Sequence, residues 1–182
     1  MNVVSARYYL AQRPVRINLA IMATVWLITS FNYYLIMFLV NTFDQIYMTA
    51  VFSSMSDVSG IAFGGILFQQ LGIKRSLSYS FMFSVSGALM LLGYGLSHQE
   101  SILFPMFILI AKFGISSAFN ILYVSHSTVF PVLFSATALG MCNFVTRIFT
   151  AISPILAQIE EPLPVIIFLI LSMLGCSVVW GI

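Results

Sequence analysis

The feature that most constrains this chain is a series of long apolar stretches. Each holds roughly 18–25 residues, enough to cross a hydrocarbon core about 30 Å thick as a helix. Six of them cover residues 17–40, 45–68, 76–95, 102–124, 131–157 and 165–182. Backbone groups in lipid must pair internally, and these runs are too long and too evenly apolar for barrel strands. The sequence therefore predicts an all-α membrane protein with six transmembrane helices.

The scarcity of charge supports this fold class. Only 7% of the residues are charged, whereas a soluble domain carries about 25%. We divide the chain into an N-terminal segment, residues 1–16, and a six-helix transmembrane domain, residues 17–182. The lipid bilayer is the expected surrounding. The small net charge of +2 gives no indication of nucleic acid binding.

The distribution of basic residues predicts the orientation in the membrane, because short cytoplasmic loops are enriched in Lys and Arg. Five basic residues lie on one side: Arg7, Arg13 and Arg16 precede the first run, and Lys74 and Arg75 follow the second. The alternate loops carry only acidic residues, namely Asp44, Glu100, Glu160 and Glu161. Both termini are therefore expected on the cytoplasm-equivalent side.

The six runs also divide into two triplets of nearly equal length, residues 17–95 and 102–182. Three crossings place the second triplet in the membrane with the opposite orientation. This is the inverted three-plus-three arrangement found within one half of a major facilitator fold. The sequence predicts one such half.

Three charged residues lie inside the apolar runs, namely Asp57, Lys112 and Arg147. Each is about 10–12 residues from the outer end of its helix, which at 1.5 Å per residue places it roughly 15–18 Å deep, near the midplane. Charge at that depth is costly and usually functional. Two cations and one anion leave a positive charge that a substrate anion would satisfy. The alternative is a structural ion pair of Asp57 with Lys112 or Arg147, whose net contribution would be small.

Other features have simpler interpretations. Gly60 and Gly64 form a small-xxx-small pair, which predicts a helix-packing face. His98 and His126 are placed in loops. The sequence contains no nucleophile elbow, phosphate-binding glycine loop or metal-ligand cluster, so we predict neither enzymatic activity nor a cofactor.

Residues 108–131, ILIAKFGISSAFNILYVSHSTVFP, carry a resemblance to a known family. This stretch is similar to the tenth helix and following loop of the organic cation/anion transporters, within the major facilitator superfamily, whose pattern reads G-K-x-x-I-x-A-A-F-N-x-x-Y-x-Y-T-x-E-L-[FY]-P-T. Trp26 with residues 29–34 resembles the seventh helix, Asp57 the acidic position of the eighth, and Gly140, Arg147 and Pro154 the eleventh.

The resemblance implies a substrate pocket lined by Tyr33, Tyr34, Phe119, Asn143 and Arg147, to which the charge argument adds Asp57 and Lys112. In this family the position of Arg147 tends to be basic in carriers of anions. The resemblance thus implies a small organic anion as substrate.

The cytoplasmic gating loops differ from the family pattern. Gln69 replaces an aspartate, Thr128 a glutamate and Ser135 an arginine, whereas Lys74 and Arg75 keep the basic character of the loop after the second run. A facilitator cavity lies between two six-helix halves, so the resemblance also implies a second half as partner.

Two functions follow from these observations. The first is a transporter half that moves a small organic anion by alternating access together with another half. The second is a non-transporting accessory subunit of a larger membrane complex, in which the gating charges have been lost.

Overall fold

A computed structural model of the chain describes residues 9, 11–40, 46–95, 97–98, 101 and 103–181. Within these residues the secondary structure is helical, and five helices are long and apolar enough to span a membrane. They are α2 (Arg13–Val40), α3 (Ile46–Met90), α4 (Leu103–Val129), α5 (Val132–Thr150) and α7 (Leu163–Val178). Shorter elements are η1 (Leu91–Gly95), α6 (Ser153–Ala157) and η2 (Val179–Gly181). The chain is an integral, multi-pass membrane protein.

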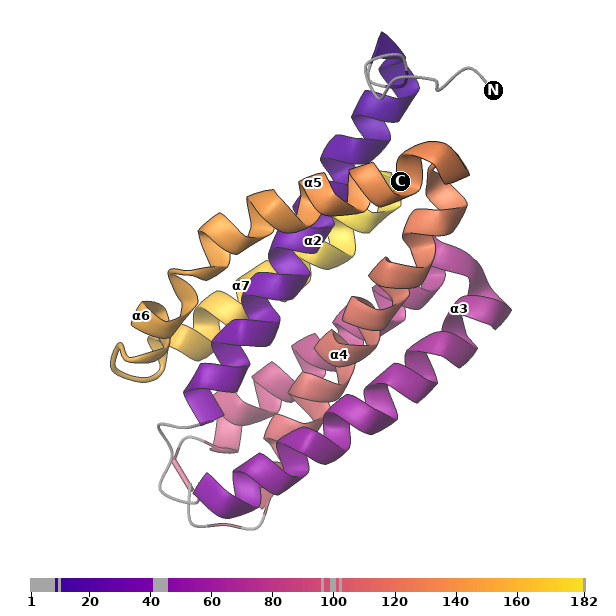
Figure 1. Cartoon of the computed structure of the whole chain (residues 1–182). Helices are drawn as coiled ribbons and strands as arrows, with labels where there is room; N and C mark the ends of the chain where they lie inside the picture. Colours follow the sequence, from indigo (N-terminus) through magenta and orange to yellow (C-terminus); the bar gives the residue numbers. More distant parts are fainter. Residues whose placement is uncertain are drawn as a thin grey trace.

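Helix α3 accounts for the difference between five long helices and six predicted runs. It joins two helices across Gly72, which has φ of 72° and ψ of −179°. A side chain disfavours this left-handed backbone conformation, so glycine fits the sharp reversal there. Figure 1 shows α3 doubling back at this point. The second and third predicted runs are therefore the two arms of α3, here called the first arm, before Gly72, and the second arm, after it.

The fifth predicted run, residues 131–157, is wrong as a single helix. The structure breaks it into α5 and α6, with residues 151–152 between them. Pro154 lies in the first turn of α6. Proline lacks the backbone N–H that would continue the ladder, and its ring clashes with the carbonyl four residues earlier. The break therefore falls just before this proline.

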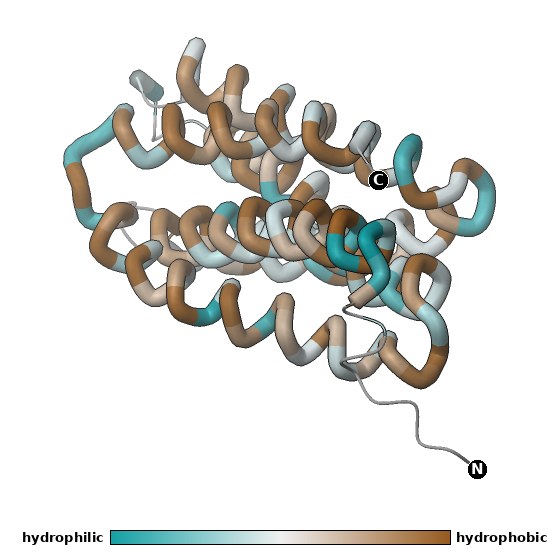
Figure 2. Tube along the Cα trace, turned by 90° about the horizontal axis from the view of Figure 1, so that it is seen from above, coloured by the Kyte–Doolittle hydropathy of each residue, from teal (hydrophilic) through white to brown (hydrophobic). Residues whose placement is uncertain are grey.

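Several helix ends lie together at one end of the bundle. Figure 1 shows the start of α2, the Gly72 turn, the junction of α4 with α5 and the C-terminal end close to one pole of the bundle. Asn18, Lys74, Val129 and Trp180 indeed line one cavity there. Figure 2 shows mostly hydrophobic residues along the helices and hydrophilic residues at the start of α2. Arg7, Asp44 and Glu100 lie outside the described residues, so the predicted sidedness stays a prediction.

Small residues bring the two arms of α3 against α4. A Cβ added at Gly60 would lie 2.9 Å from the Phe113 carbonyl oxygen, and one at Gly64 would lie 2.8 Å from that of Ser117. The predicted packing role of this glycine pair is confirmed. The approach is closer still on the second arm, where a Cβ at Gly87 would lie 2.3 Å from the Ala111 nitrogen. Such contacts, which allow strong van der Waals packing, are the usual means of helix association in lipid.

Buried polar side chains add hydrogen bonds between the helices. Ser80 Oγ lies 2.9 Å from Ser117 Oγ, which joins the second arm of α3 to α4. The Asn32 amide on α2 donates to Ser172 Oγ and to the Phe168 carbonyl on α7, at 2.9 and 3.2 Å. Each bond satisfies groups that would otherwise face an apolar surrounding. These hydrogen bonds hold α4 against α3 and α2 against α7.

Candidate functional site

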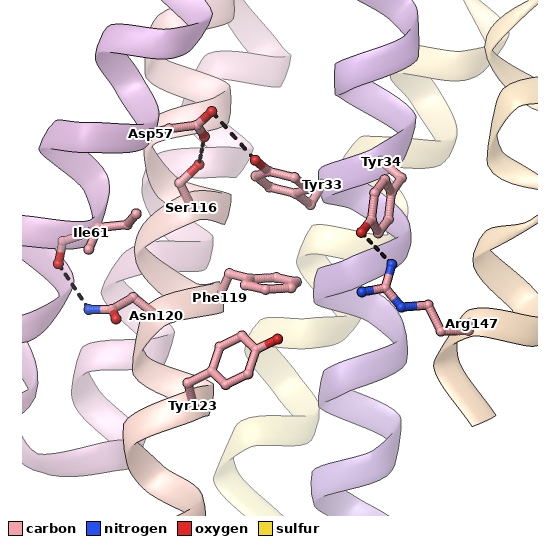
Figure 3. Close-up of a pocket in the computed structure, with 9 residues that line it drawn as sticks. All are labelled: Tyr33, Tyr34, Asp57, Ile61, Ser116, Phe119, Asn120, Tyr123 and Arg147. Carbon is pink, nitrogen blue, oxygen red and sulfur yellow. Dashed lines mark hydrogen bonds between the residues drawn. The ribbon is translucent and has the colours of Figure 1, made fainter. Parts of the chain in front are cut away.

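A cavity of about 370 Å³ opens between α2, the first arm of α3, α4 and α5. Its lining combines four aromatic side chains with polar and charged groups. The residues are Tyr33, Tyr34, Asp57, Ile61, Ser116, Phe119, Asn120, Tyr123 and Arg147. Figure 3 shows Asp57 on one wall, Arg147 on the opposite one and the rings of Tyr33, Tyr34 and Phe119 between them. Five of the seven predicted binding residues thus lie around one space.

Asp57 is held at the cavity wall by three donors. Ser116 Oγ donates to Oδ1 at 2.6 Å, while Lys112 Nζ and Tyr33 Oη approach Oδ2 at 2.8 and 3.5 Å. The Asp57 side chain remains 27% exposed. Because three donors occupy most of the roughly four acceptor sites of the carboxylate, this residue is fixed in place.

Lys112 lies behind the wall rather than in it. Its side chain is only 5% exposed, and besides Asp57 its ammonium donates to Ser53 Oγ at 2.5 Å. The same ammonium lies 5.3 Å from the centre of the Tyr33 ring. Of the two partners left open for Asp57 by the sequence, the structure selects Lys112. Lys112 was predicted to contact the substrate. In the structure it is instead a buried counter-charge for Asp57, because its ammonium already donates to that carboxylate.

Arg147 has a different environment. Its Nη1 donates to the Tyr34 hydroxyl, and its guanidinium carbon lies 5.3 Å from the centre of the Tyr34 ring. The side chain is exposed. No carboxylate within the described residues lies at salt-bridge distance from it. Arginine presents five donors in a planar fork and stays charged. Arg147 is thus a cation at the cavity with most of its donors available.

Asn143 and the predicted gating residues lie away from this cavity. Asn143 is half-buried and donates to the Leu139 carbonyl of its own helix at 3.0 Å. Gln69 is exposed near the end of the first arm of α3. Lys74 and Arg75 line the cavity of about 590 Å³ at the Gly72 pole. Thr128 belongs to the last turn of α4, where its hydroxyl donates to the Ser125 carbonyl at 2.8 Å, so the predicted loop begins later.

Sequence reasoning missed several residues of the lining. Ser116, Asn120 and Tyr123 share one face of α4 with Phe119, because Phe119 and Asn120 each lie three or four residues from both Ser116 and Tyr123. That spacing is the signal that would have identified them, because positions i, i+3 and i+4 of a helix share a face. Ile61 follows Asp57 by four residues in the same way. Asn120 also joins the walls directly, since its amide donates to the Ile61 carbonyl at 2.9 Å.

The placement of His126 was wrong. It was expected in a loop, but α4 continues to Val129 and leaves this side chain only 1% exposed. The imidazole Nε2 accepts a hydrogen bond from Trp26 Nε1. Trp26 in turn packs edge-on against Phe119 and Tyr123, with ring centroids 5.2 and 4.7 Å apart. A second layer of residues therefore supports the aromatic wall of the cavity.

Comparison with known proteins supports the resemblance. No family model matches the chain. It is 26% identical to solute carrier family 22 member 4 of Mus musculus over 75% of this chain and 25% of that protein. It is 24% identical to solute carrier family 22 member 6 of Bos taurus over 79% of this chain and 26% of that protein. It is 27% identical to the synaptic vesicle 2-related protein of Bos taurus over 64% of this chain and 20% of that protein.

These relatives are major facilitator transporters, and the chain spans about a fifth to a quarter of their length. The predicted resemblance is confirmed at this level: the chain contains a region similar to a transporter of the major facilitator type. The accessory-subunit interpretation is not favoured by these similarities.

Proposed function

We propose that this chain forms one half of a major facilitator transporter, and that its cavity binds a small organic anion through Arg147. The observation that carries this proposal is the environment of the Arg147 guanidinium. It lies at the cavity wall, is held by the neutral Tyr34 hydroxyl, and has no carboxylate partner among the described residues. An anionic group would supply the missing counter-charge and accept a bidentate pair of hydrogen bonds.

The charge balance of the wall supports an anion over a cation. Asp57 is the carboxylate in the lining, and the Lys112 ammonium lies 2.8 Å from it. This pair is neutral as a unit, so the net charge that a ligand meets is the positive charge of Arg147. A cationic substrate would therefore meet repulsion from Arg147 with little compensation from Asp57.

The remaining lining suits an organic rather than an inorganic anion. Tyr33, Tyr34, Phe119 and Tyr123 supply aromatic surface, and the rings of Tyr33 and Phe119 lie 5.3 Å apart. A volume of about 370 Å³ lies near the lower end of the range for small-ligand sites. We infer a substrate that combines one anionic group with a compact apolar body.

The second half of the transporter is part of the proposal. Helices α3 and α5, which both contribute to the cavity lining, have flanks on which Val58, Ile61, Phe144 and Ile148 expose most of their side chains. A partner half covering these flanks would enclose the cavity, and rocking of the two halves would expose it alternately to each side. The inverted three-plus-three relation between the triplets and the cytoplasm-equivalent location of both termini belong to the same proposal.

Uptake measurements on Arg147 variants test it. The chain, co-reconstituted in proteoliposomes with its partner half, should take up a labelled small aromatic carboxylate. Arg147→Ala should abolish this uptake, Arg147→Lys should retain part of it, and Arg16→Ala, which removes an exposed cation from the start of α2, should leave it unchanged. The thermal stability of each variant in detergent controls for misfolding. Unchanged uptake by a folded Arg147→Ala variant would refute the assignment.

A further inference from the structure

Two neighbouring cavities outside the proposed substrate site share the side chain of Trp180. The first is the cavity of about 590 Å³ at the Gly72 pole, which Lys74 and Arg75 line together with Asn18 and Trp180. The second has a volume of about 450 Å³ and lies along the second arm of α3 and α7. Trp180 therefore borders a basic cavity on one side and the second cavity on the other.

The first cavity presents positive charge without a counter-charge. Lys74 and Arg75 are both exposed, and neither forms an ion pair within the described part of the chain. Asn18 adds a side-chain amide, which can also donate hydrogen bonds. Both cations directly follow the Gly72 turn that ends the first arm of α3, so they lie at the end of a membrane span, where the polar headgroups begin. The cavity therefore suits an anionic group held at the membrane surface.

The second cavity is an apolar groove. Met82 and Leu89 of α3 and Met173 of α7 line it, and these three residues are 50–59% exposed. The lining also contains the hydroxyls of Ser86 and Ser177, but each donates to a carbonyl of its own helix at 2.8 Å. The groove thus offers aliphatic and thioether surface with its polar groups already hydrogen-bonded. Such a surface suits a hydrocarbon chain.

The groove follows a tight helix contact. A Cβ added at Gly175 would lie 2.7 Å from the Phe81 ring, which shows how closely α7 packs on the second arm of α3. On α7 the lining runs from Trp180 back to Met173, and at 1.5 Å per residue this is roughly 10 Å. One leaflet of the hydrocarbon core is about 15 Å thick. The groove therefore has room for a large part of one acyl chain.

We propose that the two cavities together bind a phospholipid with an anionic headgroup. The phosphate lies between Lys74 and Arg75, the Trp180 ring borders the glycerol region, and one acyl chain follows the groove toward Met173. Tryptophan suits this boundary because its ring is apolar and its N–H is polar. Basic pockets between helices bind anionic headgroups on the cytoplasmic side of membranes. A soluble anion would leave the groove unused, and an uncharged chain would leave both cations without a partner.

This site is separate from the surface that the proposed partner half would cover. That surface belongs to the first arm of α3 and to α5, neither of which contributes to the described lining of the groove. A phospholipid and a partner half can therefore bind at the same time. The lipid site does not depend on transport, because its evidence is the charge and shape of the two cavities that share Trp180.

Fluorescence of Trp180 tests the proposal, because bromine atoms on an acyl chain quench a tryptophan that they contact. The full chain is placed in vesicles of phosphatidylcholine with a minor fraction of phosphatidylglycerol, in which bromine is carried either by the phosphatidylglycerol or by an equal amount of the phosphatidylcholine. Quenching should be stronger when phosphatidylglycerol is brominated. In Trp180→Phe, which leaves only the fully buried Trp26, this difference should disappear. Equal quenching by the two lipids, or a difference that persists in Trp180→Phe, would overturn the site.

Charge variants show whether the cavity or the overall charge selects the lipid. Lys74→Gln and Arg75→Gln should each lower the preference for phosphatidylglycerol by roughly fivefold, the effect expected of one cation near an anionic surface. Arg13→Gln is the matched control, because it removes an exposed cation from the start of α2 that does not line the cavity. It should keep the parental preference, and circular dichroism checks that each variant is folded. An equal loss in Arg13→Gln, or no loss in the double variant of Lys74 and Arg75, would refute the site.

Thermal unfolding in detergent separates a phospholipid from its headgroup alone. Added phosphatidylglycerol should raise the melting temperature of the parent above that in the same amount of phosphatidylcholine, because a ligand of the folded state stabilises it. The double variant of Lys74 and Arg75 should show no such rise. Glycerol phosphate, which has the phosphate without acyl chains, should have no effect. An absent rise in the parent, or an equal rise with glycerol phosphate, would contradict a lipid that occupies both cavities.

Discussion

The pairing of Asp57 with Lys112 makes a quantitative prediction about stability. Lys112→Met removes the ammonium and leaves the carboxylate with Ser116 and Tyr33 as donors. Breaking a buried ion pair by removing one partner typically costs about 3–5 kcal/mol. The Asp57 side chain is 27% exposed and keeps both remaining donors, so the cost should lie at the lower end, about 3 kcal/mol. Asp57→Asn should cost slightly less, because the amide oxygen can still accept from Lys112.

The double variant is the decisive measurement. Replacing a buried pair by neutral groups of similar shape is often nearly neutral. Asp57→Asn combined with Lys112→Met should therefore be only about 1–2 kcal/mol less stable than the parent, although the single changes add to roughly 5–6 kcal/mol. The resulting coupling energy is about 3–5 kcal/mol, well above the 0.3–0.5 kcal/mol expected for independent sites.

Unfolding free energies measured by steric trapping in bicelles would provide this cycle. The matched control is the cycle between Asp57→Asn and Arg147→Gln, because Arg147 bonds to Tyr34 and shares no hydrogen-bond partner with Asp57. That second cycle should be additive within about 0.5 kcal/mol. Additive behaviour of Asp57 with Lys112, or strong coupling of Asp57 with Arg147, would show that the assignment of the two cations is reversed.

Three further predictions concern packing, association and orientation. Gly114→Leu should prevent α4 from packing on α3 and lower the yield of folded protein, because a Cβ there would lie 2.4 Å from the Ser80 carbonyl oxygen. Gly93→Ala is the control. Its Cβ would meet nothing within 4 Å, so this variant should fold normally in the same expression assay. The chain alone should self-associate in lipid, because each polar group of the open cavity that faces lipid without a hydrogen-bond partner costs about 1–3 kcal/mol. Single-molecule photobleaching measures the number of copies in each particle, and a dispersed monomer would contradict this prediction. A cysteine at position 74 should react with impermeant thiol reagents only from the cytoplasmic side and one at position 98 only from the outside, and reversed labelling would invert the topology.

The sequence determines most of the helices because lipid imposes a simple requirement. A span must be long, apolar and internally hydrogen-bonded, so the runs are visible without knowledge of packing. Their ends are less visible. His126 and Thr128 are polar and were predicted in a loop, but α4 buries the first and hydrogen-bonds the second to its own backbone. Burial by neighbouring helices, which sequence does not display, overrides local polarity there.

The candidate site was partly predictable for a similar reason. Midplane charges and the family resemblance pointed to Asp57, Arg147 and the aromatic residues, and depth along a helix can be counted from the sequence. The rotation of each helix about its axis cannot be counted in the same way. It turns Lys112 toward Asp57 and Ser53, and it directs the Asn143 amide to the Leu139 carbonyl of α5. Helix rotation is set by packing against neighbours, so both residues were predicted in the cavity although neither lines it.

Counting charges at the membrane midplane gives the net charge but not its location. Two cations and one anion leave one positive charge wherever the pairing occurs, and the structure decides which cation remains available. Lys112 is a compact ammonium on a flexible stem, so it reaches back to Asp57 and Ser53, which accept hydrogen bonds from two of its three donors. Arg147 has a planar fork of five donors, of which the Tyr34 hydroxyl engages one. The more suitable group for bidentate recognition of a carboxylate is thus the one left at the cavity, which is what the proposed binding of an organic anion requires.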